Sequence, residues 1–351
     1  MVEVTPISFF ERTPFSATAR QGLVDRFGRQ LTYLRISVTD RCNMSCDYCR
    51  PESGSYKAEM HAQILRYEEI ERIVRVAAGL GVTKVRITGG EPLVRRDLPD
   101  LIEMIARIPG IQDIAMSTNA TLLAKYADAL AVAGLNRINI SLDSLNAQRF
   151  RKLTMAELAP VLAGIEAAKV AGITPIKINT VLMRGINAGG SECEVAELID
   201  FAVRQQATIR FIELMPMKQG MDWERHYISI DDILQRDDLR ERINVDAALL
   251  TGNTAARYLP LKSGEGEVGF ITPMSERFCE GCNRLRLTSD GGLRSCLPAD
   301  DQLNLRDLMR QGGSDDDIAA MFFRSALIKP EIGIYSFSAD DEKRSMIQIG
   351  G

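Results

Sequence analysis

Three cysteines of this chain stand within eight residues, in the stretch CNMSCDYC. Cys42, Cys46 and Cys49 have the spacing C-x3-C-x2-C. Cysteine thiolates bind zinc or iron–sulfur clusters, and such short spacings let one loop wrap a single centre. A closed structural metal site has four protein ligands, so this first trio is one ligand short. The stretch therefore predicts a metal centre whose last position is filled by something else.

A second trio, Cys279, Cys282 and Cys296, has the spacing C-x2-C-x13-C, and the turn at residues 289–292 would fold its last cysteine back towards the others. One interpretation is that each trio is a zinc site completed by a His, an Asp or a distant residue. Two such sites would be unusual, because the chain has only two histidines. The other interpretation, which we favour, is that each centre keeps an open position for a reactant.

The remaining cysteine, Cys193, falls in a predicted helix, where we expect a small buried or half-buried residue. Seven cysteines, an odd number, and the lack of an apolar segment in the first twenty residues argue against a secreted disulfide framework. The net charge of −4 does not indicate a surface for nucleic acid. No run of eighteen uncharged apolar residues indicates a membrane span. We therefore expect a cytoplasmic protein that binds neither nucleic acid nor membrane.

Six short β-rich runs alternate with helical patterns between residues 33 and 215: YLRISVT, KVRIT, DIAMST, NRINISL, IKINTVL and TIRFIEL. Apolar residues at spacings of three and four mark the helices, as at Ile70, Ile73 and Val74. Gly81, Gly134 and Gly172 suit the C-terminal caps of several helices. This alternation predicts a parallel α/β structure, either an incomplete (βα)6 TIM-like barrel or a doubly wound sheet.

The predicted strands alternate between apolar and polar residues. Leu34 and Ile36 share one face of the first strand and Arg35 lies on the other, while Arg86 and Lys177 lie on the polar faces of the second and fifth. Parallel strands covered on both faces usually read as continuous apolar runs. Since unpaired charges in a packed barrel would be costly, the pattern favours an open barrel whose polar inner face holds a large, charged ligand. The alternative is a set of edge strands that each expose one face to water, but so many similar strands cannot all lie at sheet edges.

We divide the chain into an N-terminal extension (1–30), the partial barrel (31–215), a small C-terminal domain with the second trio (216–328) and a tail (329–351) that ends in Gly-Gly. The α/β rhythm ends near residue 215. Residues 216–265 mix turns with a polar helical stretch around 231–242. The second trio lies in a strand–turn–strand pattern, and two helical stretches follow at 303–310 and 315–323.

The first trio, with the aromatic Tyr48 before its last cysteine, resembles the radical S-adenosylmethionine (SAM) superfamily. The motifs GGEP and SLD, at the ends of the second and fourth strands, fit the same resemblance. More narrowly, LRISVTDRCN, RITGGEPLVRRDL, RFIELMPM, FCEGCNRLRLTSDG and the terminal IGG are similar to the GTP 3′,8-cyclase family, which begins molybdenum cofactor biosynthesis. The second trio with Asn-Arg-Leu-Arg behind it, and the Gly-Gly terminus, make this narrower match specific.

This resemblance implies two 4Fe–4S clusters and SAM as cofactors. The first trio would hold three irons, and the amino and carboxylate groups of SAM would chelate the fourth. The second trio would hold a cluster whose open iron binds the guanine of GTP. The 5′-deoxyadenosyl radical formed from SAM would remove the ribose 3′ hydrogen, and the product would be (8S)-3′,8-cyclo-7,8-dihydroguanosine 5′-triphosphate.

The resemblance also assigns ligand contacts to single residues. The implied GTP contacts are Arg35, Arg86, Ser117, Lys177, Arg284, Leu285 and Arg286. The implied SAM contacts are Tyr48, Gly90, Ser141 and Met215. The terminal Gly350 and Gly351 would reach into the active site and matter for turnover rather than folding. Arg137 also points inward in the strand pattern, where it would only add positive field.

One motif departs from the family pattern. Near the third strand the chain has STNA, Ser117 to Ala120, where the family has TTNG, so Ala120 replaces a glycine. Alanine disfavours a left-handed turn, so we expect a small local shift there and no change of function.

The implied partners are GTP as substrate and an unidentified electron donor; a transient contact with cyclic pyranopterin monophosphate synthase and a homodimer are left open. One alternative is a radical SAM peptide-modifying enzyme with an auxiliary cluster domain, which would not predict cations on successive strands or the Gly-Gly tail. Another is a zinc-binding structural or regulatory protein, which would contain zinc and no iron.

Overall fold

The computed structural model describes residues 22–50, 58–217, 221–247, 250–251, 255–299, 303–335 and 346–350. Within these residues the strands form one curved sheet of 12, in the order β12-β11-β10-β1-β2-β3-β4-β5-β6-β9-β8-β7. The eight strands from β10 to β9 in that order run parallel to one another, and antiparallel strands extend the sheet at each end. The sheet is therefore an incomplete TIM-like barrel, which confirms the predicted fold class.

The strands are β1 (Tyr33–Ser37), β2 (Lys84–Thr88), β3 (Asp113–Thr118), β4 (Arg137–Ser141), β5 (Ile176–Leu182), β6 (Thr208–Glu213), β7 (Leu250–Thr251), β8 (Arg257–Pro260), β9 (Glu267–Ile271), β10 (Arg284–Leu287), β11 (Gly292–Arg294) and β12 (Leu303–Asn304). The first six are the six strands that the sequence predicts. β8 and β9 fall in or beside the stretch that it assigns to turns.

The helices are α2 (Tyr67–Gly79), α3 (Leu98–Ala106), α4 (Leu123–Val132), α5 (Ala147–Thr154), α6 (Ala159–Val170), α7 (Val195–Arg204), α8 (Trp223–His226), α9 (Ile230–Leu234), α10 (Asp237–Arg240), α11 (Leu305–Arg310), α12 (Asp315–Ile328) and α13 (Met346–Ile349). Short 3₁₀ helices cover His61–Gln63, Pro92–Val94 and Gly190–Glu192. Searched over the described residues, none of these helices combines the length and apolar character needed to cross a membrane.

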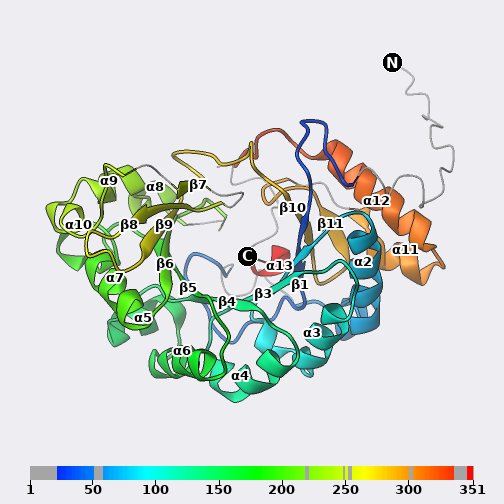
Figure 1. Cartoon of the computed structure of the whole chain (residues 1–351), viewed down its shortest axis with the longest axis horizontal. Coiled ribbons are helices and arrows are strands. Elements are labelled where there is room, and N and C mark those ends of the chain that lie inside the picture. The colour runs from blue at the N-terminus through cyan, green and yellow to red at the C-terminus, as the bar shows by residue number, and fades with distance from the viewer. Residues whose placement is uncertain are drawn as a thin grey trace.

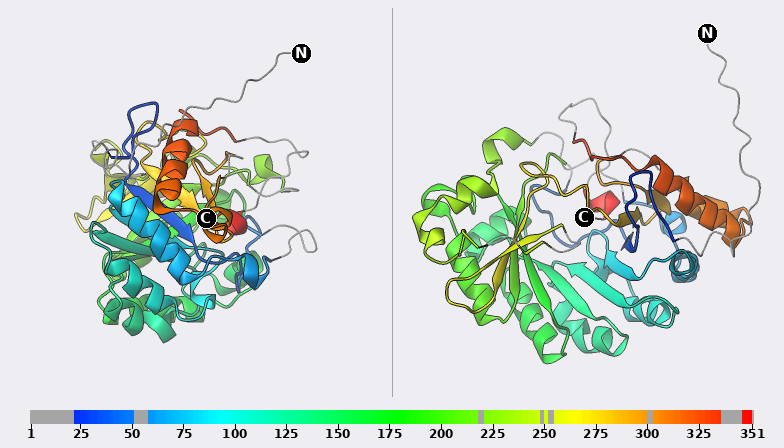
Figure 2. Two further views of the ribbon diagram at one scale, coloured as in Figure 1. Left: turned by 90° about the vertical axis from the view of Figure 1, so that its right-hand side faces the viewer. Right: turned by 45° about the horizontal axis from the view of Figure 1, so that its top comes forward.

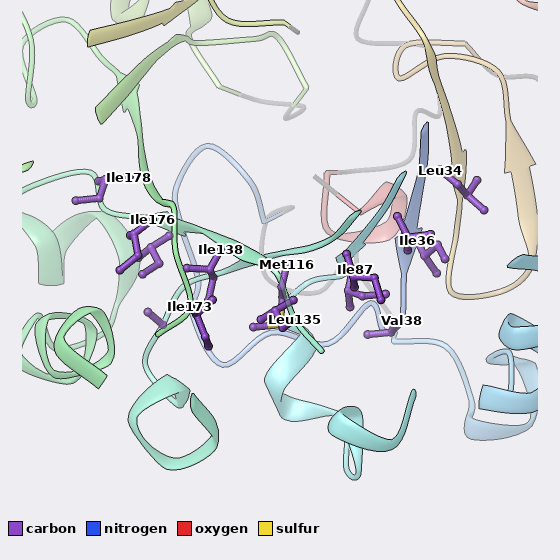
Figure 3. Packing of buried hydrophobic residues seen from close by; sticks show 14 of the residues in the cluster. Leu34, Ile36, Val38, Ile87, Met116, Leu135, Ile138, Ile173, Ile176 and Ile178 are labelled. Atoms are coloured by element: carbon purple, nitrogen blue, oxygen red, sulfur yellow. The ribbon is translucent and has the colours of Figure 1, made fainter. Parts of the chain in front are cut away.

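The helices α2 to α7 cover the convex side of the sheet, whereas α13 and the C-terminal end lie inside its curve (Figures 1 and 2). The apolar face of the strands packs against these helices, where Leu34, Ile36, Ile87 and Ile138 are each less than 1% exposed (Figure 3). The polar face is left for the concave side. This division is the one that the strand alternation predicts.

Two predicted details of the helices can be compared with the structure. Gly81, Gly134 and Gly172 have φ values of +97°, +99° and +74°, which confirms left-handed caps after α2, α4 and α6. The single polar helix predicted around residues 231–242 is wrong. It is split into α9 and α10, because Arg236 between them has an extended backbone with ψ 133°.

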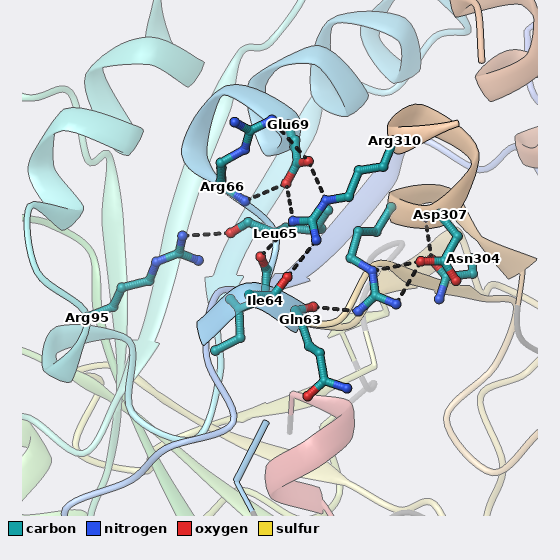
Figure 4. A network of polar contacts seen from close by, with 11 residues as sticks. Gln63, Ile64, Leu65, Arg66, Glu69, Arg95, Asn304, Asp307 and Arg310 are labelled. Carbon is teal, nitrogen blue, oxygen red and sulfur yellow. Dashed lines mark hydrogen bonds and ion pairs between the residues drawn. The ribbon is translucent and has the colours of Figure 1, made fainter. Parts of the chain in front are cut away.

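The C-terminal helices are held against α2 and the segment before it by a polar network (Figure 4). Arg310 of α11 donates from Nε to Oε1 of Glu69 at 2.9 Å and from Nη2 to Oε2 at 3.0 Å. Arg306 donates to the carbonyl of Gln63 at 2.6 Å. These contacts join segments about 240 residues apart in sequence and fix the C-terminal part of the chain on the barrel.

Candidate active site

A cavity of about 430 Å³ lies on the concave side of the sheet and extends from the amino ends of the parallel strands, lined by Tyr33, Lys84 and Arg137, to their carboxyl ends, lined by Thr88 and Ser141. The carboxyl end is where βα barrels carry their active sites. Both cysteine trios line the cavity, together with the following predicted ligand contacts: Tyr48, Gly90, Ser141, Met215, Arg35, Arg86, Ser117, Lys177, Arg284 and Arg286. The structure therefore brings the two trios and nearly all of the predicted contacts to one place.

The first trio lies on the loop that follows β1. This loop is fixed by backbone hydrogen bonds from Ser45 and Asp47 to the last residues of α5. The sulfur of Cys42 accepts hydrogen bonds from the backbone N–H of Met44 at 3.4 Å and from the side-chain amide of Asn119 at 3.8 Å. Donors aimed at a cysteine sulfur suit a thiolate that ligates a cluster.

Burial raises the pKa of the Cys46 thiol well above its ordinary value, and Cys49 beside it adds to the rise. A bound positive centre would keep such sulfurs as thiolates. None of the seven cysteines, all of which are described, forms a disulfide. Within the described ranges no three His, Cys, Asp or Glu side chains are gathered as ligands of a single metal ion. The donor set and the hydrogen bonds to sulfur fit an iron–sulfur cluster held by three cysteines.

The predicted SAM contacts Tyr48, Gly90, Ser141 and Met215 line the same cavity as this loop. The Tyr48 hydroxyl donates to Oδ2 of Asp143 at 2.8 Å, which ties the loop to the SLD motif after β4. Burial raises the pKa of Asp143 to about 6. The Tyr335 hydroxyl lies 3.2 Å from the sulfur of Met215.

The GGEP motif is built from close backbone approaches. A Cβ added to Gly90 would lie 2.4 Å from the carbonyl oxygen of Arg41 and 3.0 Å from Cγ1 of Ile347 in α13. Glycine is thus required here by contacts within the chain itself, besides any approach to a ligand. Glu91 accepts hydrogen bonds from the Thr118 hydroxyl and the Asn119 backbone, both at 2.7 Å, and so joins GGEP to the STNA motif.

The backbone at Ala120 of that motif differs from the expectation. The left-handed turn that alanine was expected to disfavour is present, with φ +61°. Both backbone polar groups of Ala120 are hydrogen-bonded. The amide donates to the Thr118 hydroxyl at 3.0 Å, and the carbonyl accepts from the Leu123 amide at 3.0 Å. Gly164 of α6 leaves room for the turn, since a Cβ there would lie 2.4 Å from the Ala120 oxygen. The local contacts outweigh a backbone cost of about 1–2 kcal/mol.

Arginines gather at one level across three neighbouring strands. Arg35 of β1 is in register with Arg286 of β10 on one side and with Arg86 of β2 on the other. Like charges placed opposite one another across strands are destabilising. Burial lowers the pKa of Arg35 well below its ordinary value, and the charge of Arg286 lowers it further. Burial lowers the pKa of Arg286 to about 10, with Arg284 adding to the effect.

This arginine group has the electrostatic features of an anion site. The Nε atom of Arg86 is buried and has no hydrogen-bond partner among the described residues. Arg284 and Lys177 line the same cavity, and Lys177 donates to the Tyr258 hydroxyl at 2.9 Å. A polyanion such as a triphosphate would offset the mutual repulsion of these cations through charge-assisted hydrogen bonds.

The other predicted contacts behave differently from one another. Ser117 lines the cavity and lies 3.4 Å from the side-chain amide of Asn139. Arg137 also lines it but is paired with Asp113, so its charge is largely neutralised locally. Leu285 does not line the cavity; its side chain is 1% exposed and belongs to the apolar core on the other face of β10.

The second trio lies at the open end of the β10–β11 hairpin, as the predicted turn requires. The Cys282 amide donates to the Cys279 carbonyl at 3.1 Å. Burial opposes ionisation of Cys282, but Lys329 and Arg284 outweigh it and lower the pKa of this thiol to about 7. Three cysteines with cations beside them also suit an iron–sulfur cluster.

The described end of the C-terminal tail, α13 with Gly350, lies inside the curve of the sheet (Figure 1). Arg286 donates from Nη1 to the Gly350 carbonyl at 3.0 Å. Gly350 has φ +80°, and a Cβ there would lie 2.7 Å from both Cβ of Ser37 and Oγ1 of Thr88. Only glycine fits this position. Gly351 lies outside the described residues.

Sequence reasoning missed several cavity residues. Arg210 of β6 is 8% exposed and lines the cavity, and burial lowers its pKa to about 10. Its signal was available, because it alternates with Ile209 and Phe211 as the other inward cations do with their neighbours. Lys329 and Tyr335 carry no such periodic signal, because they follow the last long helix.

Comparisons with known proteins agree on the family. A model of the radical SAM superfamily matches residues 36–202, and a model described as Molybdenum Cofactor Synthesis C matches residues 207–333. A GTP 3′,8-cyclase from Pelotomaculum thermopropionicum is 43% identical over 329 residues, covering 93% of this chain and 99% of that protein. A GTP 3′,8-cyclase from Alkaliphilus metalliredigens is also 43% identical, over 330 residues, with the same coverage.

Solved structures with a similar fold include Streptococcus suis SuiB bound to precursor peptide SuiA, with a TM-score of 0.59 and 17% identity over 88% of this chain and 70% of that one. Native anSMEcpe with bound AdoMet has a TM-score of 0.55 and 16% identity, over 85% of this chain and 81% of that one. At such low identity the likeness shows the fold alone.

Proposed function

The chain belongs to the GTP 3′,8-cyclase family of the radical SAM superfamily, and we propose that the cavity between the two trios binds SAM at the first trio and GTP between the two. It is a radical SAM enzyme of molybdenum cofactor synthesis that acts on GTP. The product is (8S)-3′,8-cyclo-7,8-dihydroguanosine 5′-triphosphate.

The observation that carries this proposal is the row of arginines at one register on β10, β1 and β2. These cations destabilise one another and line the same cavity as the first trio. A triphosphate supplies the missing negative charge, and the row would orient it so that the ribose and base lie towards the cysteines.

The first trio would hold a 4Fe–4S cluster, and the second trio a further one that binds the guanine. When bound, the first cluster supplies the electron that cleaves SAM into methionine and a 5′-deoxyadenosyl radical. The chain's own part is to hold the reactants. Tyr48 and Asp143 shape the SAM side, Arg35 and Arg86 fix the triphosphate, and the tail at Gly350 closes the cavity against water.

The rest of the proposal concerns the partners of the enzyme and its location in the cell. An electron donor of the host cell would reduce the first cluster, and the product would pass to cyclic pyranopterin monophosphate synthase through a transient contact or a free intermediate. We propose a cytoplasmic enzyme, with a homodimer left to measurement. A peptide-modifying activity is not favoured, because the proteins that share 43% identity with this chain are GTP cyclases.

The triphosphate site is tested by Arg86→Met. This variant keeps the aliphatic part of the side chain and removes the charge, so we expect GTP to bind about 10- to 100-fold more weakly, as for the loss of a charged hydrogen bond of about 1.5–3 kcal/mol. Anaerobic titration calorimetry measures this affinity. Binding of guanosine, which has no phosphate, should change little.

Arg107→Met is the matched control, because Arg107 is an exposed arginine paired with Glu103 far from the cavity. It should leave the GTP affinity unaltered. If Arg86→Met binds GTP as tightly as the native chain does, the arginine row is not the triphosphate site.

A further inference from the structure

Lys329 is a buried cation beside the second trio. It directly follows α12 and is 1% exposed. Its Nζ donates hydrogen bonds to the carbonyl of Arg284 at 3.0 Å and to the carbonyl of Ser295 at 2.6 Å. Arg284 follows Cys282 by two residues and Ser295 precedes Cys296 by one. Lys329 thus bridges the two chain segments that carry these cysteines.

The charge of the ammonium group also acts on the cysteines themselves. It favours the thiolate forms of both Cys282 and Cys296. A hydrophobic or neutral residue could fill the same space, but only a cation brings positive charge to both sulfurs.

The surroundings hold Lys329 and the chain after it in place. Arg29 donates to the carbonyls of Cys279 and Glu331 at 2.8 and 2.9 Å, so it ties the loop of the second trio to the segment after Lys329. A Cβ added to Gly333 would lie 3.1 Å from the Cys296 sulfur. The segment therefore packs directly on the second trio.

On the premise of a cluster at the second trio, which belongs to the proposed function, we propose that Lys329 is a positioning residue for that cluster. It sets the spacing between Cys282 and Cys296, and its charge favours the reduced form. Positive charge and hydrogen bonds at cluster sulfurs stabilise the more negative, reduced state and so raise the reduction potential.

The test uses full-length protein whose first trio is changed to alanine, so that only the second cluster is observed. After anaerobic reconstitution, a redox titration followed by electron paramagnetic resonance gives its midpoint potential. Lys329→Gln keeps hydrogen-bond donors without the charge, and Lys329→Met removes both. We expect Lys329→Gln to keep its iron with a more negative midpoint potential, and Lys329→Met to lose iron as well.

Lys169→Gln is the matched control. Lys169 is a lysine of α6 that pairs with Glu166 at 3.5 Å and is not among the residues that line the cavity. It should leave the midpoint potential where it is in the parent chain. A midpoint potential and an iron content in both Lys329 variants equal to those of the parent would overturn the assignment.

The absence of a second cluster can be distinguished from the absence of a role for Lys329. Native chain reconstituted with iron and sulfide should hold about eight irons, four for each cluster. If it holds about four, and the chain without the first trio holds none, then the second cluster is absent and the proposed function is at fault. If the iron is present and insensitive to Lys329, only the role of Lys329 is lost.

Discussion

At the scale of single residues, this chain has a group of buried cations that lowers its stability and suits it to bind an anion. The group consists of Arg35, Arg86 and Arg286. Burial lowers the pKa of all three, and the charges of Arg286 and Arg86 lower the pKa of Arg35 further. Hydrophobic residues of similar volume would often be more stable there. The arrangement makes sense when an anion completes it. Arg137 needs no such anion, because its partner Asp113 already balances its charge.

Strand alternation allows Arg35, Arg86 and Lys177 to be predicted from the sequence, because a period of two fixes which face each side chain occupies. The same alternation places the side chain of Arg210 in β6 on the inward face. It also excludes Leu285 from the cavity, since a residue between two inward arginines must face the core. The role of Lys329 could not be predicted, because it depends on two carbonyls that only the folded hairpin brings together.

Gly350→Ala tests the C-terminal tail. An added methyl would overlap Ser37 and Thr88, and φ +80° is unfavourable for alanine, so the tail should leave its place beside Arg286. We expect kcat/KM for GTP consumption to fall about tenfold or more, with the melting temperature nearly unchanged.

Gly172→Ala is the control for this change, because Gly172 has a similar φ of +74° but open space around it. It should cost about 1 kcal/mol of stability and leave kcat/KM as it is. Full activity in Gly350→Ala would mean that the tail has no part in turnover.

At the scale of elements, Glu69 joins α2 to α11. Burial opposes its ionisation, but hydrogen bonds from Arg310 and from the Arg66 backbone outweigh burial and lower the pKa of Glu69. A lowered carboxyl pKa contributes stability above the unfolded-state pKa and loses it as the pH falls through the folded-state value. We therefore expect Glu69→Gln to reduce the free energy of unfolding at pH 7 by about 1–3 kcal/mol.

Urea unfolding of the cluster-free protein measures this effect. The difference between native and Glu69→Gln should shrink as the pH is lowered from 7 to about 4. Glu103→Gln is the control, because the Glu103–Arg107 pair is exposed and should contribute less than about 1 kcal/mol. A difference that is absent at pH 7, or equal at both pH values, would contradict this account of the α2–α11 contact.

The elements differ in how well the sequence predicts them. β1 to β6 carry β-branched residues in a period of two and are separated by helices, so local pattern suffices. β9 follows β6 in the sheet but comes more than fifty residues later in the chain, and its place depends on pairing with β6. The break between α9 and α10 depends on one extended residue, which no periodicity reveals.

At the scale of the whole molecule, the barrel and the C-terminal domain share one sheet. β10 pairs with β1 and β9 pairs with β6, so both edges of the six-stranded barrel are covered by later parts of the chain. We expect a fragment of residues 1–215 to aggregate or to be cut quickly by protease, because it would expose two long strand edges. Size-exclusion chromatography and limited proteolysis measure this.

A chain ending at residue 335 is the control, because it keeps every strand of the sheet. It should remain monodisperse and resistant. A soluble 1–215 fragment that unfolds cooperatively would instead support the boundary at residue 215 as a true division between independent domains.

That one cavity joins SAM cleavage to GTP cyclisation is a claim that anaerobic incubation of the reconstituted chain with GTP, SAM and a reductant can test. We predict that 5′-deoxyadenosine forms in step with the loss of GTP and the appearance of the 3′,8-cyclised nucleotide. Replacing the first trio by alanine should abolish all three. Formation of 5′-deoxyadenosine while GTP stays intact would contradict the claim.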